Sequence, residues 1–183
     1  MSKVDSAMEF AKKRHHGQTR KNDTTPYFEH LEKVVSRLKN LGVTDETTLC
    51  AGWLHDTIED GKATFDEIES MFDHPTALLV LSLSKDESLP KKDKENQYIS
   101  QLKTANFQAK LIKLCDISAN LKDMENSNMS KTKKKKTVAQ KLHYLKVIKN
   151  ELKEHINEFP QMESFVKGIN NYAAEFHQRP VQF

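Results

Sequence analysis

Helical spacing of apolar residues runs through nearly all of this chain and limits its fold more than any other feature. Near the start, Val4, Ala7, Met8 and Ala11 occupy the i, i+3, i+4 and i+7 positions of one helix face. No segment alternates apolar and polar residues as a half-buried strand would, and five glycines and five prolines interrupt the 183 residues. The sequence therefore predicts an all-α fold.

The expected helices follow one another with short connections. Pro26 stands where a helix would begin, Gly61 stands where one would end, and Thr64 with Glu67 has the spacing of a capping box. Helices are predicted over residues 4–16, 26–39, 45–60, 64–72, 75–83, 98–102, 109–124 and 137–157, with one more after Pro160. Residues 17–26 are expected to form a loop, and residues 84–95 a loop or a helix start.

We expect residues 1–183 to form a single domain, a helical bundle. The chain has no internal repeat, and no segment has the composition of a linker. The core would occupy about residues 5–157, and residues 158–183 would add a C-terminal helix and a tail. Charged residues make up 30% and hydrophobic residues 37%, which is ordinary for a globular protein in water.

The basic residues give little reason to expect a nucleic-acid partner. The formal net charge is +3, and the run Lys133–Lys136 has no aromatic residues between its lysines. A run of this kind is usually a solvated loop or the start of a helix. Its functional alternative is a basic lip that attracts a polyphosphate.

The sequence also predicts a cytoplasmic protein. The first residues lack the apolar core of a signal peptide, and no apolar run approaches the length that crosses a bilayer. Cys50 and Cys115 lie in apolar helical segments and form no CxxC pair, so we expect reduced, buried thiols. Such thiols are typical of a reducing compartment.

The run from Trp53 to Asp60 is the most informative local motif. It places the pair His55-Asp56 one helical turn before the pair Glu59-Asp60. On a helix these four residues would share one face of roughly 140°, at about 100° per residue. Because three carboxylates and an imidazole are costly to bury unpaired, the motif points to a divalent cation.

Two further residues are candidates for the same cation. His30 belongs to the preceding predicted helix, and Asp116 follows the apolar run Leu111–Cys115. Two imidazoles and two carboxylates favour Mn²⁺, Fe²⁺, Zn²⁺ or Mg²⁺ over a thiolate-bound metal. Taken singly, His30 could be a packing histidine, Asp116 could pair two helices, and His55-Asp56 could lie on the surface. Their joint occurrence on three predicted helices favours a metal site.

The order His30, His55-Asp56, Asp116 resembles the HD superfamily of metal-dependent phosphohydrolases. The finer pattern is similar to the hydrolase domain of the RelA/SpoT family, and specifically to its stand-alone small alarmone hydrolases, the metazoan SpoT homologues. This resemblance rests on the motifs at residues 16–21, 26–30, 54–60 and 112–116, with Asn120 one turn further on. It extends over about residues 5–150.

The resemblance implies a specific activity and a specific set of site residues. Enzymes of this family hydrolyse the 3′-diphosphate of ppGpp and pppGpp to GDP or GTP and pyrophosphate, usually with Mn²⁺. The implied residues are the metal ligands His30, His55, Asp56 and Asp116, the catalytic pair Glu59 and Asp60, and the substrate contacts Arg20, Lys21 and Asn120. The implied partner is a small nucleotide, without nucleic acid or membrane, and the sequence predicts no particular oligomeric state.

Other interpretations stay open at this point. Glu59 and Asp60 could orient a ligand or a water, and Arg20-Lys21 could be an ordinary solvated pair. A catalytically silent nucleotide-sensing module is an alternative of another class, although none of the expected ligands is missing.

The chain also departs from the family pattern. The departures are Leu31, Ile117, Ala119 and a loop between Lys21 and Pro26 that lacks glycine. The last three are expected on the substrate side. An adenine alarmone or another nucleotide such as NADPH is therefore an alternative substrate.

Overall fold

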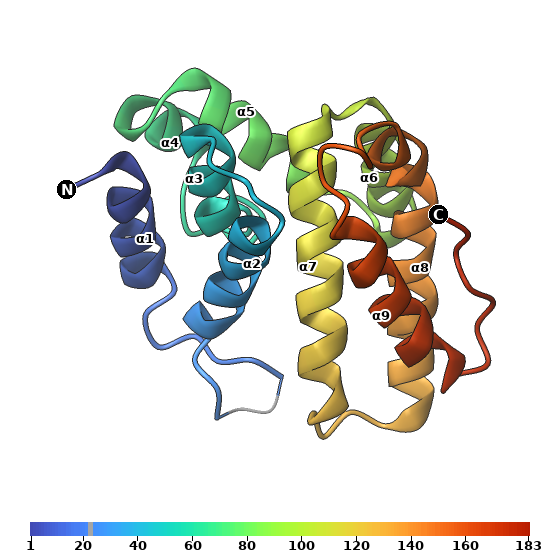
Figure 1. The fold of residues 1–183 in the computed structure, drawn as a ribbon. Coiled ribbons are helices and arrows are strands. Elements are labelled where there is room, and N and C mark those ends of the chain that lie inside the picture. The colour runs from blue at the N-terminus through green and yellow to red at the C-terminus, as the bar shows by residue number, and fades with distance from the viewer. Residues whose placement is uncertain (22–23) are drawn as a thin grey trace.

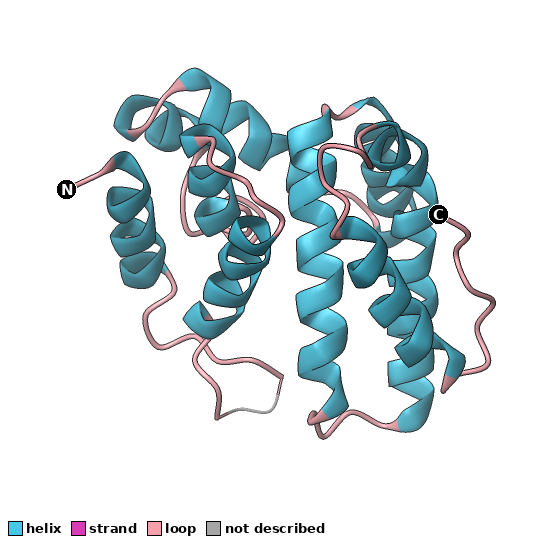
Figure 2. Ribbon diagram, viewed as in Figure 1, coloured by secondary structure: helices cyan, strands magenta, loops and turns pink. Residues whose placement is uncertain are grey.

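The computed structural model describes residues 1–21 and 24–183, and this part of the chain is all-α, as predicted (Figure 1, Figure 2). The predicted loop residues Asn22 and Asp23 lie outside the described residues. The nine helices of the described part are α1 (Lys3–Arg14), α2 (Phe28–Asn40), α3 (Glu46–Leu54), α4 (Phe65–Met71), α5 (His74–Leu83), α6 (Lys91–Thr104), α7 (Phe107–Glu125), α8 (Lys131–Glu154) and α9 (Met162–Ala174).

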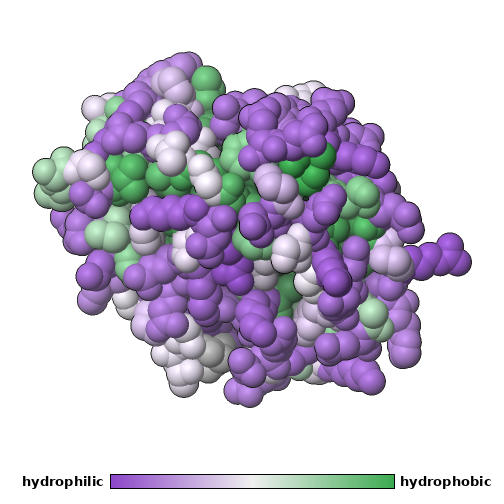
Figure 3. Space-filling view, viewed as in Figure 1, coloured by the Kyte–Doolittle hydropathy of each residue, from purple (hydrophilic) through white to green (hydrophobic). Residues whose placement is uncertain are grey.

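Helix α7 is the centre of the arrangement. It runs between α1–α5 on one side and α6, α8 and α9 on the other (Figure 1), and it contacts α2, α3 and α5 as well as α8 and α9. Its sequence explains this position, because residues 109–117 are buried all round the helix. One hydrophobic cluster continues through both groups of helices. The face seen in Figure 3 is mostly hydrophilic, with small groups of apolar side chains.

Several predicted helix boundaries were wrong. Helix α2 begins at Phe28, two residues after Pro26, and α8 begins at Lys131, six residues before its predicted start. Helix α6 begins at Lys91, within the segment 84–95 that was expected to be a loop or a helix start. The first turns of α6 and α8 are rich in lysine and other good helix formers but lack an apolar stripe, so periodicity did not reveal them. The run Lys133–Lys136 therefore belongs to the start of a helix.

The capping box predicted at Thr64 is half formed. The Thr64 hydroxyl accepts a hydrogen bond from the backbone N–H of Glu67 at 3.1 Å. The Glu67 carboxylate instead pairs with Arg14, which ties α1 to the start of α4. A tertiary ion pair has thus replaced the second, local hydrogen bond of the predicted motif.

The largest correction concerns residues 55–60, which form turns rather than the predicted helix. Helix α3 ends at Leu54, whose carbonyl accepts hydrogen bonds from both the N–H and the hydroxyl of Thr57, at 2.9 and 2.6 Å. Because the Leu54 carbonyl accepts from residue 57 rather than from the N–H of residue 58, the regular i to i+4 hydrogen bonding of the helix stops here. Gly61, with φ +64°, completes the turn.

A glycine lets α3 lie close to α2. A Cβ added at Gly52 would be 2.7 Å from Cδ1 of Leu38, nearer than real Cβ atoms come. The close approach brings the C-terminal end of α3, which precedes His55, against the helix that carries His30.

Two smaller observations concern the cysteines and the length of the apolar helices. Cys50 and Cys115 are buried free thiols, as expected. None of the helices within residues 1–21 and 24–183 has the length and apolar character needed to cross a membrane.

Candidate metal centre

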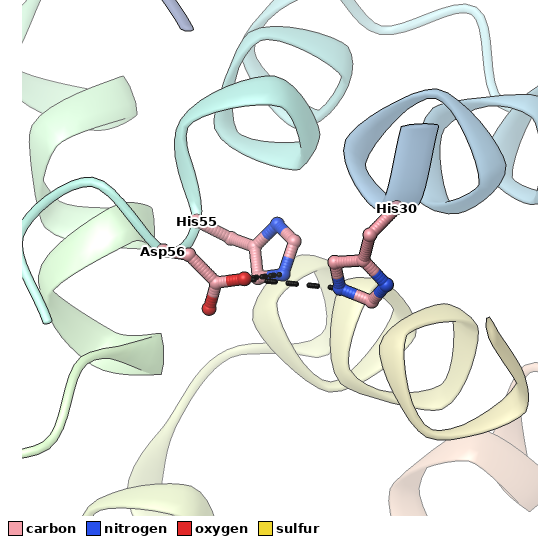
Figure 4. Close-up of side chains that lie close together, drawn as sticks. All are labelled: His30, His55 and Asp56. Atoms are coloured by element: carbon pink, nitrogen blue, oxygen red, sulfur yellow. Dashed lines mark ion pairs between the residues drawn. The ribbon is translucent and has the colours of Figure 1, made fainter. Parts of the chain in front are cut away.

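Three of the four predicted metal ligands form a tight cluster. The Oδ2 atom of Asp56 lies 3.0 Å from Nε2 of His55 and 3.7 Å from Nε2 of His30 (Figure 4). Asp116 joins them from α7, with its Oδ1 atom 3.2 Å from Nε2 of His30 and 3.8 Å from Nε2 of His55. The structure thus brings His30, His55, Asp56 and Asp116 together, and we call these four residues the metal floor.

The geometry of the metal floor fits a single divalent ion. Donor atoms about 2.1 Å from one ion are roughly 3.0–3.4 Å apart in octahedral or tetrahedral coordination. The four measured separations are only slightly longer on average. The Nε2 atoms of His30 and His55 are buried and have no hydrogen-bond partner within the described residues. Unpaired imidazole nitrogens directed at carboxylate oxygens are what a cation site requires.

Neighbouring groups orient the proposed ligands. The Nδ1 atom of His55 is 2.8 Å from the carbonyl oxygen of Gly52, so Nδ1 donates a proton to that carbonyl and Nε2 faces the floor. The Tyr27 hydroxyl donates to Oδ2 of Asp56 at 2.5 Å. Lys113 donates to Oδ2 of Asp116 at 2.8 Å, whereas Oδ1 faces the imidazoles and also accepts a hydrogen bond from the side-chain amide of Asn120.

The charges of the metal floor also suit a cation. Burial lowers the pKa of His55, but the carboxylates of Asp56 and Asp116 outweigh burial and raise the pKa to about 10. Burial opposes ionisation of both carboxyls, yet His55 and Lys113 hold the pKa of Asp56 and of Asp116, respectively, below the ordinary value. Two ionised carboxylates in a buried position therefore attract positive charge strongly.

The metal floor opens into a cavity of about 760 Å³, a volume in the range of small-molecule sites. Asp56 and Asp116 line this cavity. So do the other five predicted site residues, which are Arg20, Lys21, Glu59, Asp60 and Asn120.

The predicted catalytic pair is held by two different loops. The Glu59 carboxylate accepts the backbone N–H of Lys85 at 2.9 Å, and burial raises the pKa of Glu59. The Asp60 carboxylate is more exposed and accepts the side-chain amide of Gln18 at 2.8 Å. The two residues reach the cavity from a turn, although the sequence predicted a helix.

The predicted substrate contacts also make contacts around the cavity. Arg20 donates to Oδ1 of Asn120 at 2.7 Å, and its guanidinium lies 5.2 Å from the ring centre of Tyr27. Burial lowers the pKa of Lys21, and the nearby charges of Lys133 and Arg20 lower it further. Three positive charges, those of Arg20, Lys21 and Lys133, therefore lie near one another at this part of the cavity.

Five lysines that the sequence did not predict as site residues line the cavity, and three of them, Lys85, Lys113 and Lys141, lie over tyrosine rings. We call these three the lysine wall. Lys85 and Lys113 lie 5.0 and 5.2 Å from the ring centre of Tyr98. Lys141 lies 5.9 Å from the ring centre of Tyr144, and burial is the main reason that its pKa falls to about 8. Lys113 carried a usable signal, because it is a charged residue inside an apolar helix, three positions before Asp116.

The structure corrects the position of two departures from the family pattern. Ile117 and Ala119 were expected on the substrate side, but both are completely buried in the hydrophobic core. They stand next to Asp116 and Asn120 in sequence and point to another face of α7. Leu31 is also a fully buried core residue. These three departures therefore do not argue against guanine.

Comparison with known proteins decides the family. A family model described as an HD domain matches residues 7–158. The chain belongs to the HD domain family. This match confirms the family resemblance that the sequence motifs indicated.

Several named enzymes are similar to this HD domain. Guanosine-3′,5′-bis(diphosphate) 3′-pyrophosphohydrolase MESH1 of Danio rerio is 39% identical over 117 residues, which are 63% of this chain and 65% of that protein. The enzyme of the same name from Homo sapiens is 38% identical over 120 residues, 64% of this chain and 67% of that protein. The matched segment thus spans just under two thirds of the zebrafish relative.

A solved structure is similar over nearly the whole HD domain. It is described as a metazoan ortholog of SpoT that hydrolyzes ppGpp and plays a role in starvation responses. Its TM-score is 0.82 at 26% sequence identity, and the match covers 93% of this chain and 95% of that chain.

Proposed function

We propose that this HD domain hydrolyses the 3′-diphosphate of guanosine alarmones such as ppGpp and pppGpp and releases pyrophosphate with GDP or GTP. The observation that carries this proposal is the convergence of the metal floor at the bottom of a cavity whose sides carry lysines and Arg20. The related enzymes named for this reaction support the choice of substrate.

We propose Mn²⁺ as the metal, held by His30, His55, Asp56 and Asp116. Two imidazole nitrogens and two carboxylate oxygens form a mixed donor set that suits Mn²⁺ and several other divalent ions. Such an ion polarises a phosphoryl oxygen and lowers the pKa of water.

In the proposed reaction, the oxygen of a water molecule bonds to the phosphorus next to the 3′-oxygen. The bond from that phosphorus to the 3′-oxygen breaks, and the 3′-oxygen takes up a proton. Glu59 accepts the proton of the attacking water, because its buried carboxyl has a raised pKa and is fixed by the N–H of Lys85. Asp60, held by Gln18, is the second carboxylate of this proton exchange.

The remaining cavity residues are proposed to bind the nucleotide. The lysine wall would neutralise the phosphate oxygens, because its three ammonium groups face the cavity beside Asp116 and Glu59. Arg20, Lys21 and Asn120 would contact the base side, where a planar guanidinium can stack on a purine. The lysines of the run Lys133–Lys136 would form a basic lip, since the charge of Lys133 is felt at Lys21.

We further propose a reducing compartment such as the cytoplasm as the place of action. The support for this is the pair of buried thiols, and burial raises the pKa of Cys50 to about 11.

The test is to purify the protein with Mn²⁺ and to supply ppGpp, pppGpp, ppApp and NADPH in separate reactions. We expect pyrophosphate with GDP or GTP from the two guanine substrates. Release of orthophosphate from NADPH alone would mean a phosphatase. Tight binding without turnover of any of the four would mean a nucleotide-sensing module.

A further inference from the structure

His30 is the member of the metal floor whose ring is least well held. His30 is 1% exposed, and neither nitrogen of its ring has a hydrogen-bond partner among the described residues. His55 differs, because the carbonyl of Gly52 fixes its Nδ1 atom. A buried imidazole with two unpaired nitrogens is costly, and binding an ion at Nε2 would satisfy one of them. The Nδ1 atom of His30 needs an acceptor of its own.

Asp123 faces that nitrogen. It lies on α7 one turn after Asn120 and two turns after Asp116, so all three occupy one side of the helix. Its Oδ2 atom is 3.8 Å from Nδ1 of His30. This oxygen is also buried, and it has no hydrogen-bond partner in residues 1–21 and 24–183. A movement of about 1 Å would bring the two atoms to hydrogen-bond distance.

The rest of the Asp123 carboxylate is anchored on the substrate side. Its Oδ1 atom accepts a hydrogen bond from Lys33 at 2.7 Å. The guanidinium of Arg20 lies 3.2 Å from Oδ2, the same oxygen that faces His30. One half-buried carboxylate therefore stands between a proposed metal ligand and a proposed nucleotide contact.

We propose that Asp123 is a positioning residue that accepts the Nδ1–H of His30 and shares the same oxygen with Arg20. The hydrogen bond would fix the His30 tautomer, direct Nε2 to the metal floor and make the imidazole a better ligand. When a nucleotide engages Arg20, Oδ2 becomes fully available to His30. This last step rests on the proposed function, because it requires Arg20 to bind the nucleotide.

The first experiment measures Mn²⁺ binding to the full chain by calorimetry, without any nucleotide. Asp123→Asn keeps the shape of the side chain and removes its charge. We expect the variant to bind Mn²⁺ about 10- to 100-fold more weakly, the usual effect of losing a carboxylate behind a ligating histidine. Asp93→Asn is the matched control, because it makes the same charge change at an exposed residue in the first turn of α6 and should bind as the wild type does.

Arg20→Gln separates the two partners of Asp123. It should bind Mn²⁺ at least as tightly as the wild type, because it releases Oδ2 to His30, while KM for ppGpp rises. Asp123→Asn should change both the Mn²⁺ affinity and KM. Wild-type Mn²⁺ affinity in Asp123→Asn would overturn the positioning role and leave the proposed function standing. Weak Mn²⁺ binding by Asp123→Asn, combined with a wild type that hydrolyses no alarmone, would support the positioning role and overturn the proposed function.

A measurement on the wild type keeps the test independent of how the variant folds. In a long-range ¹H–¹⁵N spectrum of the Zn²⁺-loaded protein, we expect His30 with a protonated Nδ1 and an unprotonated Nε2. The opposite tautomer at His30 would contradict the proposal, since Nδ1 would then have no proton to donate to Asp123.

Discussion

The metal floor and the lysine wall line one cavity, yet they hold their charges in different ways. In the floor, opposite charges meet directly, and short hydrogen bonds from Tyr27 and Lys113 fix the two carboxylates. In the wall, three ammonium groups lie over the rings of Tyr98 and Tyr144. Lys113 is paired with Asp116, whereas burial lowers the pKa of Lys141 to about 8. The floor is thus arranged to bind a cation, whereas the wall gains most when an anion reaches it.

The comparison predicts that damage to the metal floor has the largest effect on the reaction. In His55→Asn, kcat for ppGpp should fall at least about 1,000-fold, because the several kcal/mol supplied by the cation are lost. Chelation of the wild type should cause the same loss, and added Mn²⁺ should reverse it. His143→Asn, an exposed histidine on α8, is the control and should keep wild-type kcat.

The proposed catalytic pair should matter for turnover but not for the metal. In the double variant Glu59→Gln, Asp60→Asn, kcat should fall about 100-fold or more, the range for loss of general acid–base catalysis. Calorimetry should show unchanged Mn²⁺ affinity. Wild-type turnover by this variant would remove both residues from the mechanism.

The pH profile should identify the proton acceptor. Burial raises the pKa of Glu59, so its carboxyl stays protonated to a higher pH than an ordinary glutamate does. A protonated Glu59 cannot take the proton of water, and kcat/KM should therefore fall tenfold per pH unit below that pKa. The matching measurement is the pH dependence of kcat/KM for Glu59→Gln. The residual kcat/KM of this variant should be low and should not show the fall at acid pH.

Damage to the lysine wall should instead weaken binding. Lys141→Met removes one charge-assisted contact to phosphate, so KM should rise about tenfold at nearly constant kcat. Lys146→Met, at an exposed position one turn further along α8, should leave both constants unchanged. A fall in kcat with constant KM would mean that the wall serves chemistry, and the contrast with the floor would be lost.

The smallest effect is expected from the basic lip. Replacing all four lysines of Lys133–Lys136 with glutamine should lower kcat/KM about threefold at low salt and hardly at all at high salt. Initial rates at two ionic strengths measure this. An equal loss at both would indicate a direct contact instead of long-range attraction.

The metal floor was open to prediction because its residues stand out from their neighbours. His55-Asp56 follows an apolar helix, and Asp116 interrupts another, so these residues can be recognised without knowledge of the fold. The conformation around His55 could not be predicted in this way, because α3 ends at Leu54, where a hydrogen bond from the hydroxyl of Thr57 takes the carbonyl. The predicted common helix face was therefore wrong, although the four side chains do lie close together.

The lysine wall shows why other parts of the site escaped prediction. Lys141 is one of many lysines on α8, and only the packing of α8 against α7 brings it within 3.8 Å of Asp116. The prediction that Ile117 and Ala119 lie on the substrate side was wrong for a related reason, because tertiary packing decides which face of α7 is buried. Residues whose role depends on which helices meet carry no local signal in the sequence.

The metal floor is tested most directly by a crystal structure of the Mn²⁺-loaded protein with anomalous diffraction at the manganese edge. We expect one strong peak at bonding distance, about 2.0–2.3 Å, from Nε2 of His30, Nε2 of His55 and an oxygen of each of Asp56 and Asp116. Manganese bound elsewhere, or a floor in which the imidazoles pair with the carboxylates and hold no ion at saturating Mn²⁺, would contradict this expectation.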